Sequence, residues 1–361
     1  MGGAGVRAAR YTDGSAEVAD ESTFFSGRKP GRFHDRGISR ATPTAGRRAP
    51  FDGKVITVRG PVAPSELGLT LAHEHLFSNF GGDPAEWDGY DEAALVAAVA
   101  PYLAKLRGFG CQTIVDATAA WFGRRPDLLR TLSEQSGIHV LTNTGYYGAA
   151  NDRYVPRSAF EESADAIAGR WVREFREGIA GTGIRPGFMK IGVDEGPLSP
   201  IDRKLIVAAA RAHRQTGLTI AVHTGGNPEA AREQVAILRD ENVSPNAWIW
   251  VHANSALNAG DLVWAAEQGA WISLDGLEEA SVDRHLTLLL RLREAGRMGQ
   301  VLLSHDGNSF RATGRPPKAY DALFHLFLPR LRADGFTADE IRQLTEINPQ
   351  RAYTISTRLL G

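Results

Sequence analysis

From about residue 54 onward, the chain alternates short apolar runs with longer amphipathic segments. The apolar runs are Leu69–His73, Gln112–Asp116, His139–Asn143, Gly187–Ile191, Thr219–His223, Trp248–His252, Trp271–Asp275 and Val301–His305. Between them, apolar residues recur at helical spacing, as in Asp91–Leu106, Ser158–Glu177 and Asp202–Thr216. Eight strands that alternate with helices predict a parallel sheet, and about 300 residues suit a (β/α)8 barrel.

A doubly wound open sheet is the main alternative to the barrel. Such a sheet usually carries a glycine-rich phosphate-binding turn after its first strand, where this chain has His73 and His75 instead. We therefore predict an α/β protein with a (β/α)8 TIM barrel over residues 51–361. A leading segment, Val55–Val62, is expected to form a small hairpin over the floor of the barrel.

The first 50 residues have a different composition from the rest of the chain. They are rich in Gly, Ser, Ala, Thr and Arg and lack a sustained hydrophobic period, which predicts a disordered N-terminal tail over residues 1–50. The pair Arg47-Arg48 is not followed by the apolar region of a signal peptide.

Overall composition is that of an ordinary globular protein, with 43% hydrophobic and 23% charged residues. A formal charge of −1 gives no general attraction to nucleic acid or anionic membranes. The single cysteine, Cys111, excludes an internal disulfide and suits a reducing compartment, so we expect a cytoplasmic protein. Its expected partner is a small-molecule substrate.

Residues of the kinds that bind metals stand at the ends of the predicted strands. They are His73, His75, Lys190, His223, His252 and Asp306. Side chains at i and i+2 of a strand point the same way, so both histidines of His73-Glu74-His75 can reach one ion. In a barrel the C-terminal strand ends form the active face, so residues far apart in the sequence would meet in one cavity.

Each of these residues also has an ordinary structural interpretation. A histidine that closes an apolar run can be a hydrogen-bonded polar residue, and Asp306 can cap a helix. Lys190, flanked by Phe188, Met189 and Ile191, is costly to bury as a cation. Desolvation would leave a neutral amine, which reacts with CO2 to give a carbamate, an anionic ligand that can bridge two metals.

Histidine, carboxylate and carbamate ligands favour two Zn²⁺ ions, and Mn²⁺, Co²⁺ or Fe²⁺ also suit them. Two such ions can share a hydroxide that attacks a carbonyl or phosphoryl group. Asp306 and Lys190 are the predicted catalytic residues, with Asp306 moving a proton to the leaving group.

Six motifs together resemble the phosphotriesterase family of the amidohydrolase superfamily. They are GLTLAHEHL, MKIGVDEG, VHTGG, WVHAN, LSHDG and INPQRAY, within roughly Thr57–Thr357. The resemblance implies that His73, His75 and Asp306 hold a buried metal, that His223 and His252 hold a more exposed one, and that carboxylated Lys190 bridges them. It also suggests a homodimer.

Within that family, efficient phosphotriesterases tend to have Asp-His after the seventh strand, which forms a proton relay. This chain has Asp275-Gly276 there. Lactonase-like relatives often carry an aromatic residue at a position similar to Tyr147. The predicted substrate contacts are Tyr147, Tyr146, Trp121, Asp275, Arg311 and Arg315. The two arginines, with Lys318, suit an anionic group or simply form a solvated basic loop.

The sequence therefore favours a hydrolase that uses a metal-bridging hydroxide on a lactone, carboxylic ester or related acyl bond, with weak phosphotriesterase activity. A phosphotriesterase proper and an amide hydrolase are the enzymatic alternatives. A mononuclear deaminase would leave Lys190 unexplained. A barrel that binds its ligand without turning it over is the non-enzymatic alternative.

Overall fold

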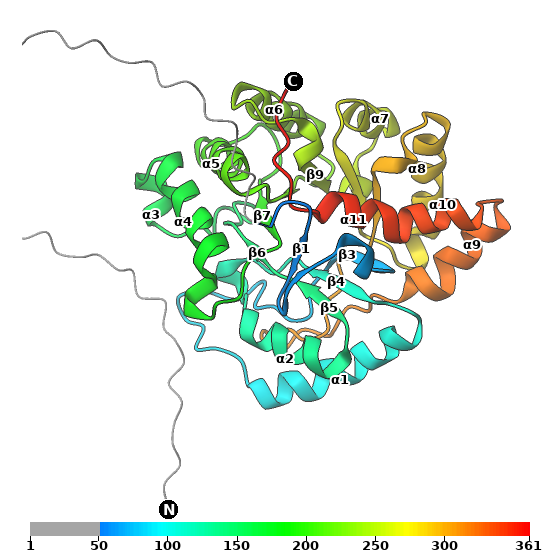
Figure 1. Cartoon of the computed structure of the whole chain (residues 1–361), viewed down its shortest axis with the longest axis horizontal. Helices are drawn as coiled ribbons and strands as arrows, with labels where there is room; N and C mark the ends of the chain where they lie inside the picture. The colour runs from blue at the N-terminus through cyan, green and yellow to red at the C-terminus, as the bar shows by residue number, and fades with distance from the viewer. Residues whose placement is uncertain (1–50) are drawn as a thin grey trace, which may run out of the picture. The chain divides into compact units, whose positions relative to one another are not determined.

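The computed structural model describes residues 51–361, and these form a barrel of parallel strands within a ring of helices (Figure 1). The predicted disordered tail, residues 1–50, lies outside the described residues. The strands of the barrel are β3 (Thr70–Glu74), β4 (Thr113–Asp116), β5 (His139–Leu141), β6 (Asn143–Thr144), β7 (Phe188–Gly192), β8 (Ile220–His223), β9 (Trp248–Val251), β10 (Trp271–Leu274) and β11 (Val301–Leu303). All eight predicted runs coincide with these strands, and the third is divided at Thr142 into β5 and β6.

The barrel closes through two junctions between its sheets. One sheet has the order β3-β4-β5 and the other β11-β10-β9-β8-β7-β6, and the pairing within both is parallel. The chain itself joins β5 to β6. At the other junction, Asp306 N donates to His73 O at 3.2 Å and His75 N donates to Gly307 O at 2.9 Å. The predicted barrel is thus confirmed.

Helices follow the strands as the hydrophobic period predicts. They are α1 (Glu92–Gly108), α2 (Pro126–Ser136), α3 (Ser158–Glu161), α4 (Ala164–Glu177), α5 (Pro200–Thr216), α6 (Pro228–Asp240), α7 (Ala259–Glu267), α8 (Val282–Glu294), α9 (Leu328–Ala333), α10 (Ala338–Arg342) and α11 (Asn348–Tyr353). The predicted helix over Ser158–Glu177 is two helices, because Ser163 starts α4 as its N-cap, accepting from Ala166 N.

The floor of the barrel is closed by the predicted hairpin and the C-terminal helix. Strands β1 (Val55–Thr57) and β2 (Gly60–Val62) pair antiparallel. Val55 packs in one apolar cluster with residues of the barrel strands and with Tyr353 of α11. The Tyr353 hydroxyl also donates to Ala72 O at 2.8 Å. A sealed floor leaves the opposite, C-terminal end of the strands as the open face.

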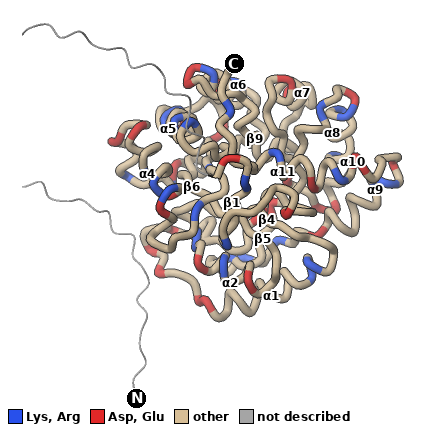
Figure 2. The backbone as a smooth tube through the Cα atoms, viewed as in Figure 1, with Lys and Arg blue, Asp and Glu red and all other residues tan. Residues whose placement is uncertain are grey.

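The outer surface mixes both signs of charge. Lys, Arg, Asp and Glu alternate over the surrounding helices in the view of Figure 2. Within residues 51–361, no helix is long and apolar enough to cross a membrane.

Candidate metal centre

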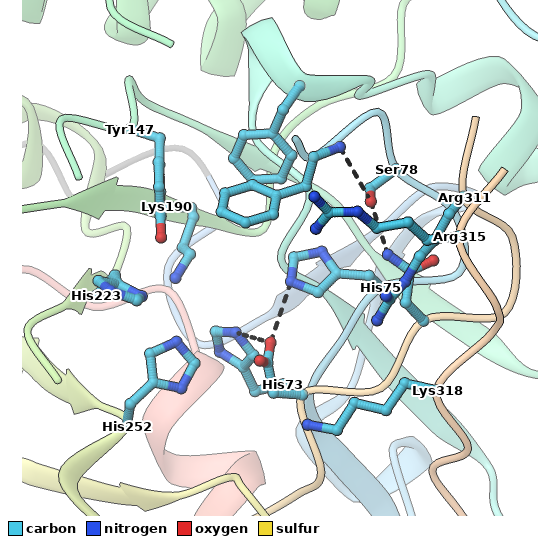
Figure 3. Close-up of a pocket in the computed structure, with 14 residues that line it drawn as sticks. His73, His75, Ser78, Tyr147, Lys190, His223, His252, Arg311, Arg315 and Lys318 are labelled. Carbon is cyan, nitrogen blue, oxygen red and sulfur yellow. Dashed lines mark hydrogen bonds and ion pairs between the residues drawn. The ribbon is translucent and has the colours of Figure 1, made fainter. Parts of the chain in front are cut away.

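A cavity of about 330 Å³ opens at the C-terminal ends of the strands. All six predicted metal ligands line it, and they come from five barrel strands or the turns after them: His73, His75, Lys190, His223, His252 and Asp306. Figure 3 shows the histidines and Lys190 facing a common space. The barrel therefore brings together side chains that are up to 233 positions apart in the sequence.

His73, His75 and Asp306 form the first cluster in this cavity. Asp306 Oδ1 lies 3.5 Å from His73 Nε2 and 3.3 Å from His75 Nε2. Burial and the nearby Lys190 ammonium lower the pKa of His73 to about 4, so its imidazole is neutral. Burial alone would raise the pKa of Asp306, but the charge of His252 and the imidazoles of His73 and His75 beside the carboxylate outweigh it and hold that pKa well below the usual range.

The tautomer of His75 follows from its other ring nitrogen. His75 Nδ1 lies 2.8 Å from Thr118 Oγ1, and that hydroxyl already donates to Phe77 O at 2.9 Å. The hydroxyl must therefore accept from Nδ1–H, so in a neutral ring Nε2 is the nitrogen that carries the lone pair. Nε2 faces the Asp306 carboxylate at 3.3 Å, so the two groups are placed to share a cation.

His223 and His252 form the second cluster, with ring centroids 4.5 Å apart. His252 Nδ1 donates to Asp275 Oδ1 at 2.7 Å, and His252 N donates to Asp275 Oδ2 at 3.1 Å. Burial alone would lower the pKa of His252, but the Asp275 and Asp306 carboxylates outweigh it and raise that pKa. The bond at Nδ1 leaves Nε2 as the nitrogen that a metal ion would bind in place of a proton. Burial and the neighbouring His252 lower the pKa of His223 well below its usual value, so this ring offers a neutral nitrogen.

Lys190 lies between the two clusters, at the centre of β7, and is only 1% exposed. Its Nζ makes no hydrogen bond within residues 51–361 and lies 5.6 Å from the ring centroid of Tyr147. Burial lowers the pKa of Lys190 to about 8, against the opposing effect of Asp306 and Asp275. A neutral amine is thus accessible near neutral pH, as the sequence predicts.

Two of the candidate ligands have left-handed backbones. His252 has φ 61° and Asp306 has φ 52°, a region that few non-glycine residues occupy. At Asp306 the surrounding network holds this conformation. The fully buried Glu74 carboxylate accepts from His305 Nδ1 at 2.6 Å and from Gly307 N at 2.7 Å, on either side of Asp306. Glu74 and His305 therefore point away from the cavity.

The donor set fits divalent cations. His73 Nε2 is buried and has no hydrogen-bond partner among residues 51–361. Together with Nε2 of His75, Nε2 of His252 and the ionised Asp306, it supplies nitrogen and carboxylate donors without thiolates. A second group of ligand-type atoms, His73, His252 and Asp275, lies close together. The carboxylate of Asp275 already accepts from His252 and from Ser273 Oγ, so hydrogen bonds account for that group.

Comparison with known families decides where the chain belongs. Residues 53–353 match the family model described as "Phosphotriesterase family". The chain belongs to the phosphotriesterase family. Its members are metal-dependent hydrolases, which agrees with the ligand set in the cavity.

Two relatives illustrate the range of names within the phosphotriesterase family. A "Phosphotriesterase homology protein" of Escherichia coli (strain K12) is 29% identical over 294 residues, covering 79% of this chain and 98% of that protein. An "N-acetyltaurine hydrolase" of Tetraodon nigroviridis is 27% identical over 349 residues, covering 84% of this chain and 99% of that protein.

Solved structures of the family share the fold. An "Organophosphorus Hydrolase from Deinococcus radiodurans" has a TM-score of 0.76 and 29% identity, covering 86% of this chain and all of that one (100%). A mutant "PTE-like lactonase" of the same organism has a TM-score of 0.73 and 29% identity, covering 83% of this chain and 99% of that one.

The predicted substrate contacts divide into two groups in the structure. Tyr147, Arg311 and Arg315 line the cavity. Tyr146, next to Tyr147, faces the other way because adjacent residues of an extended chain alternate. Its ring packs on Trp171, and its hydroxyl accepts from Arg170 Nη1 at 2.7 Å.

Trp121 and Asp275 also differ from their expected roles as substrate contacts. Trp121 packs against the hydrophobic core, and the neighbouring Phe122 lines the cavity in its place. Asp275 is fully buried beneath His252 and does not line the cavity. The one-residue displacement at Trp121 reflects the loop conformation, which a hydrophobic period does not specify.

Several cavity residues carry no signal that sequence reasoning could use. Ser78, Phe80, Phe122 and Asn308 line the cavity, and Thr118 orients His75 from behind. Ser78 and Phe80 belong to an irregular segment after β3, and Phe122 ends the short 3-10 helix Ala120–Phe122 after β4. In such segments no hydrophobic period predicts which side chain faces inward. Thr118 follows Asp116, at the strand end where ligand-supporting groups are expected.

Asp275→Asn tests the supporting role of Asp275. An amide places an NH2 group against donors that the carboxylate accepts, so His252 loses its fixed orientation. We expect metal affinity to fall by about 10- to 100-fold, measured by competition with a chromogenic chelator. Asp240→Asn, at an exposed position on α6, is the matched control. Unchanged metal affinity, with a native circular dichroism spectrum, would remove Asp275 from the support of the centre.

Proposed function

We propose that this protein is a binuclear metal-dependent hydrolase that opens a lactone, carboxylic ester or related acyl bond. One observation carries the proposal: the six candidate ligands, from distant segments of the sequence, line one cavity at the open end of the barrel. His73, His75 and Asp306 would hold one ion, and His223 and His252 the other. Lys190 would join them as a carbamate, which CO2 forms on its neutral amine. Zn²⁺ suits these donors best.

When bound, the two ions would polarise the scissile carbonyl and lower the pKa of a water molecule toward neutrality. The chain itself supplies orientation and proton transfer. Asp306 is ionised and its carboxyl group is 34% exposed to the cavity, so it can take a proton from water and give it to the leaving oxygen. The ring of Tyr147, 5.2 Å from that of His223, offers an apolar face beside the reacting group.

The region after β10 supports an acyl substrate over a phosphotriester. The proton relay of efficient phosphotriesterases would need a histidine directly after Asp275, where this chain has Gly276. A Cβ added at Gly276 would lie 2.5 Å from Asn254 Nδ2. Asn254 is held there because its Oδ1 accepts from Asp275 N at 3.2 Å. The place of the relay is thus occupied by an amide with no acid–base function.

Amide hydrolysis is the second candidate function. The similarity to the N-acetyltaurine hydrolase of Tetraodon nigroviridis favours it. The same chemistry serves an amide if Asp306 protonates the leaving nitrogen. Hydrolysis of phosphotriesters is the third candidate, and the similarity to the "Organophosphorus Hydrolase from Deinococcus radiodurans" supports it.

A substrate screen of the zinc-loaded protein tests this ranking. Panels of lactones, carboxylic esters, N-acyl amino acids and the triester paraoxon would be compared by kcat/KM at pH 8. We expect lactones or esters to be the best substrates and paraoxon to be turned over weakly. Paraoxon turnover well above that of every acyl compound would reverse the ranking, and a dominant N-acyl substrate would favour the amide hydrolase.

A further inference from the structure

The wall of the cavity beyond His75 carries three basic side chains, Arg311, Arg315 and Lys318, which we call the basic wall. Resting on the proposed acyl hydrolase function, we propose that the natural substrate bears an anionic group, a carboxylate or a chemically similar sulfonate or phosphate. The basic wall would hold this anion while the scissile bond lies at the metal centre. In Figure 3 the three side chains lie on the opposite side of His75 from Lys190 and His223.

The basic wall belongs to the segment between β11 and the π-helical turn Leu323–Phe327. This segment is fixed to the barrel by its backbone. Ser78 N donates to Phe310 O at 2.9 Å, and Ala312 N donates to Ser78 O at 2.9 Å, on either side of Arg311. Arg311 is therefore built into the rim of the barrel, since its two neighbours are bonded to the chain after β3.

Lys318 is fixed in the same way, by pairing within the segment. Asn308 and Lys318 exchange two backbone hydrogen bonds of 2.8 Å each. The side chain of Asn308 donates to Ser78 Oγ at 2.6 Å. Lys318 Nζ donates to His305 O at 3.0 Å, so the ammonium group is held at the cavity and keeps two further donors. A freely solvated loop would not need these bonds.

Charges on the basic wall are not neutralised by the protein. Within residues 51–361, neither guanidinium, of Arg311 or of Arg315, forms an ion pair or a side-chain hydrogen bond. Among residues 51–361, Asp306 is the single acid that lines the cavity, and it lies against His73 and His75. Arginines elsewhere are commonly paired, as Arg293 is with Glu340 at 2.7 Å. Unpaired guanidinium groups in a cavity match the geometry of a carboxylate, sulfonate or phosphate.

The aromatic part of the cavity wall indicates what the uncharged part of the substrate would be. Phe80, Phe122 and Tyr147 contact one another edge to face, with ring centroids 5.2 to 6.0 Å apart. This face suits the hydrocarbon part of a small acyl compound. A substrate that fills the cavity would thus have a short apolar body, an acyl group at the metal centre and an anion at the basic wall.

A matched pair of lactones tests the proposal. One is the γ-lactone 5-oxotetrahydrofuran-2-carboxylate, and the other is its neutral carboxamide. We expect the wild-type protein to prefer the anion by about 10- to 100-fold in kcat/KM. In the double variant Arg311→Gln/Arg315→Gln this preference should fall to within about threefold of unity, through a higher KM for the anion. The control Arg157→Gln/Arg332→Gln removes two exposed charges away from the cavity and should keep the wild-type preference.

A binding measurement tests the basic wall independently of any hydrolase activity. The ring-opened dicarboxylate product would be titrated calorimetrically into each zinc-loaded protein, with a sulfonate and a phosphate analogue as further arms. Weaker binding to the cavity variant than to the control, even if neither lactone is hydrolysed, would support the basic wall while contradicting the lactonase activity. Equal kcat/KM for the two lactones in the wild type, or equal binding of the dicarboxylate to the cavity variant and the control, would overturn the basic wall.

Discussion

Replacing Lys190 by alanine is expected to reduce turnover by at least about 1,000-fold. The side chain is buried at the centre of β7, between the two histidine clusters, and its amine has no hydrogen-bond acceptor within residues 51–361. Without the amine, the proposed carbamate cannot form, and the two proposed ions would lose their shared ligand. The measurement is kcat/KM for the best acyl substrate, together with zinc content after gel filtration.

The space left in the alanine variant allows a sharper test of the carbamate. Acetate or propionate can enter that space and present two carboxylate oxygens where the carbamate would stand, so we expect partial recovery of activity. Lys190→Met fills the same space with an apolar side chain of similar length, so it should be inactive and insensitive to these acids. Full activity in either variant, or equal responses of both to acetate, would contradict a bridging role for Lys190.

Asp306→Asn should preserve the fold while lowering kcat by about 10²- to 10⁴-fold. Asparagine tolerates the left-handed backbone of Asp306, whose φ is 52°, so the substitution removes charge without adding strain. It also removes the anion beside His73 and His75, and with it both a proposed metal ligand and the group proposed to move the proton. Initial rates with saturating zinc would measure the loss.

Asp152→Asn is a closely matched control for this variant. Asp152 also has a left-handed backbone, with φ 59°, and does not line the cavity. We expect it to keep the wild-type rate, and both variants to retain the wild-type circular dichroism spectrum and melting temperature to within a few degrees. A wild-type kcat in Asp306→Asn would exclude this residue from the chemistry.

The hydrophobic period was sufficient to predict the barrel because each strand is buried on both faces and each helix on one. The hydrophobic period did not predict two boundaries, one within a helical segment and one within a strand. Ser163 caps a helix inside Ser158–Glu177 and so divides it. The break at Thr142 within the third strand has no counterpart in the apolar pattern of His139–Asn143.

The candidate ligands could be predicted because strand ends of a barrel converge, whatever the intervening loops do. The groups that orient those ligands could not be ranked in the same way. Asp275 and Tyr147 both follow strands, yet the first is buried beneath His252 and the second faces the cavity. The conformation of the loop decides whether Tyr146 or Tyr147 faces the cavity. No periodic pattern in the sequence predicts that conformation.

The number of metal ions bound per chain tests the central claim most directly. The wild-type protein, stripped of metal and then dialysed against zinc and bicarbonate, would be analysed by inductively coupled plasma mass spectrometry. Six converging side chains with a carbamate at Lys190 predict two zinc ions per chain. A single ion would point to mononuclear chemistry, and a chain that retains none would contradict the metal centre and leave only a ligand-binding barrel.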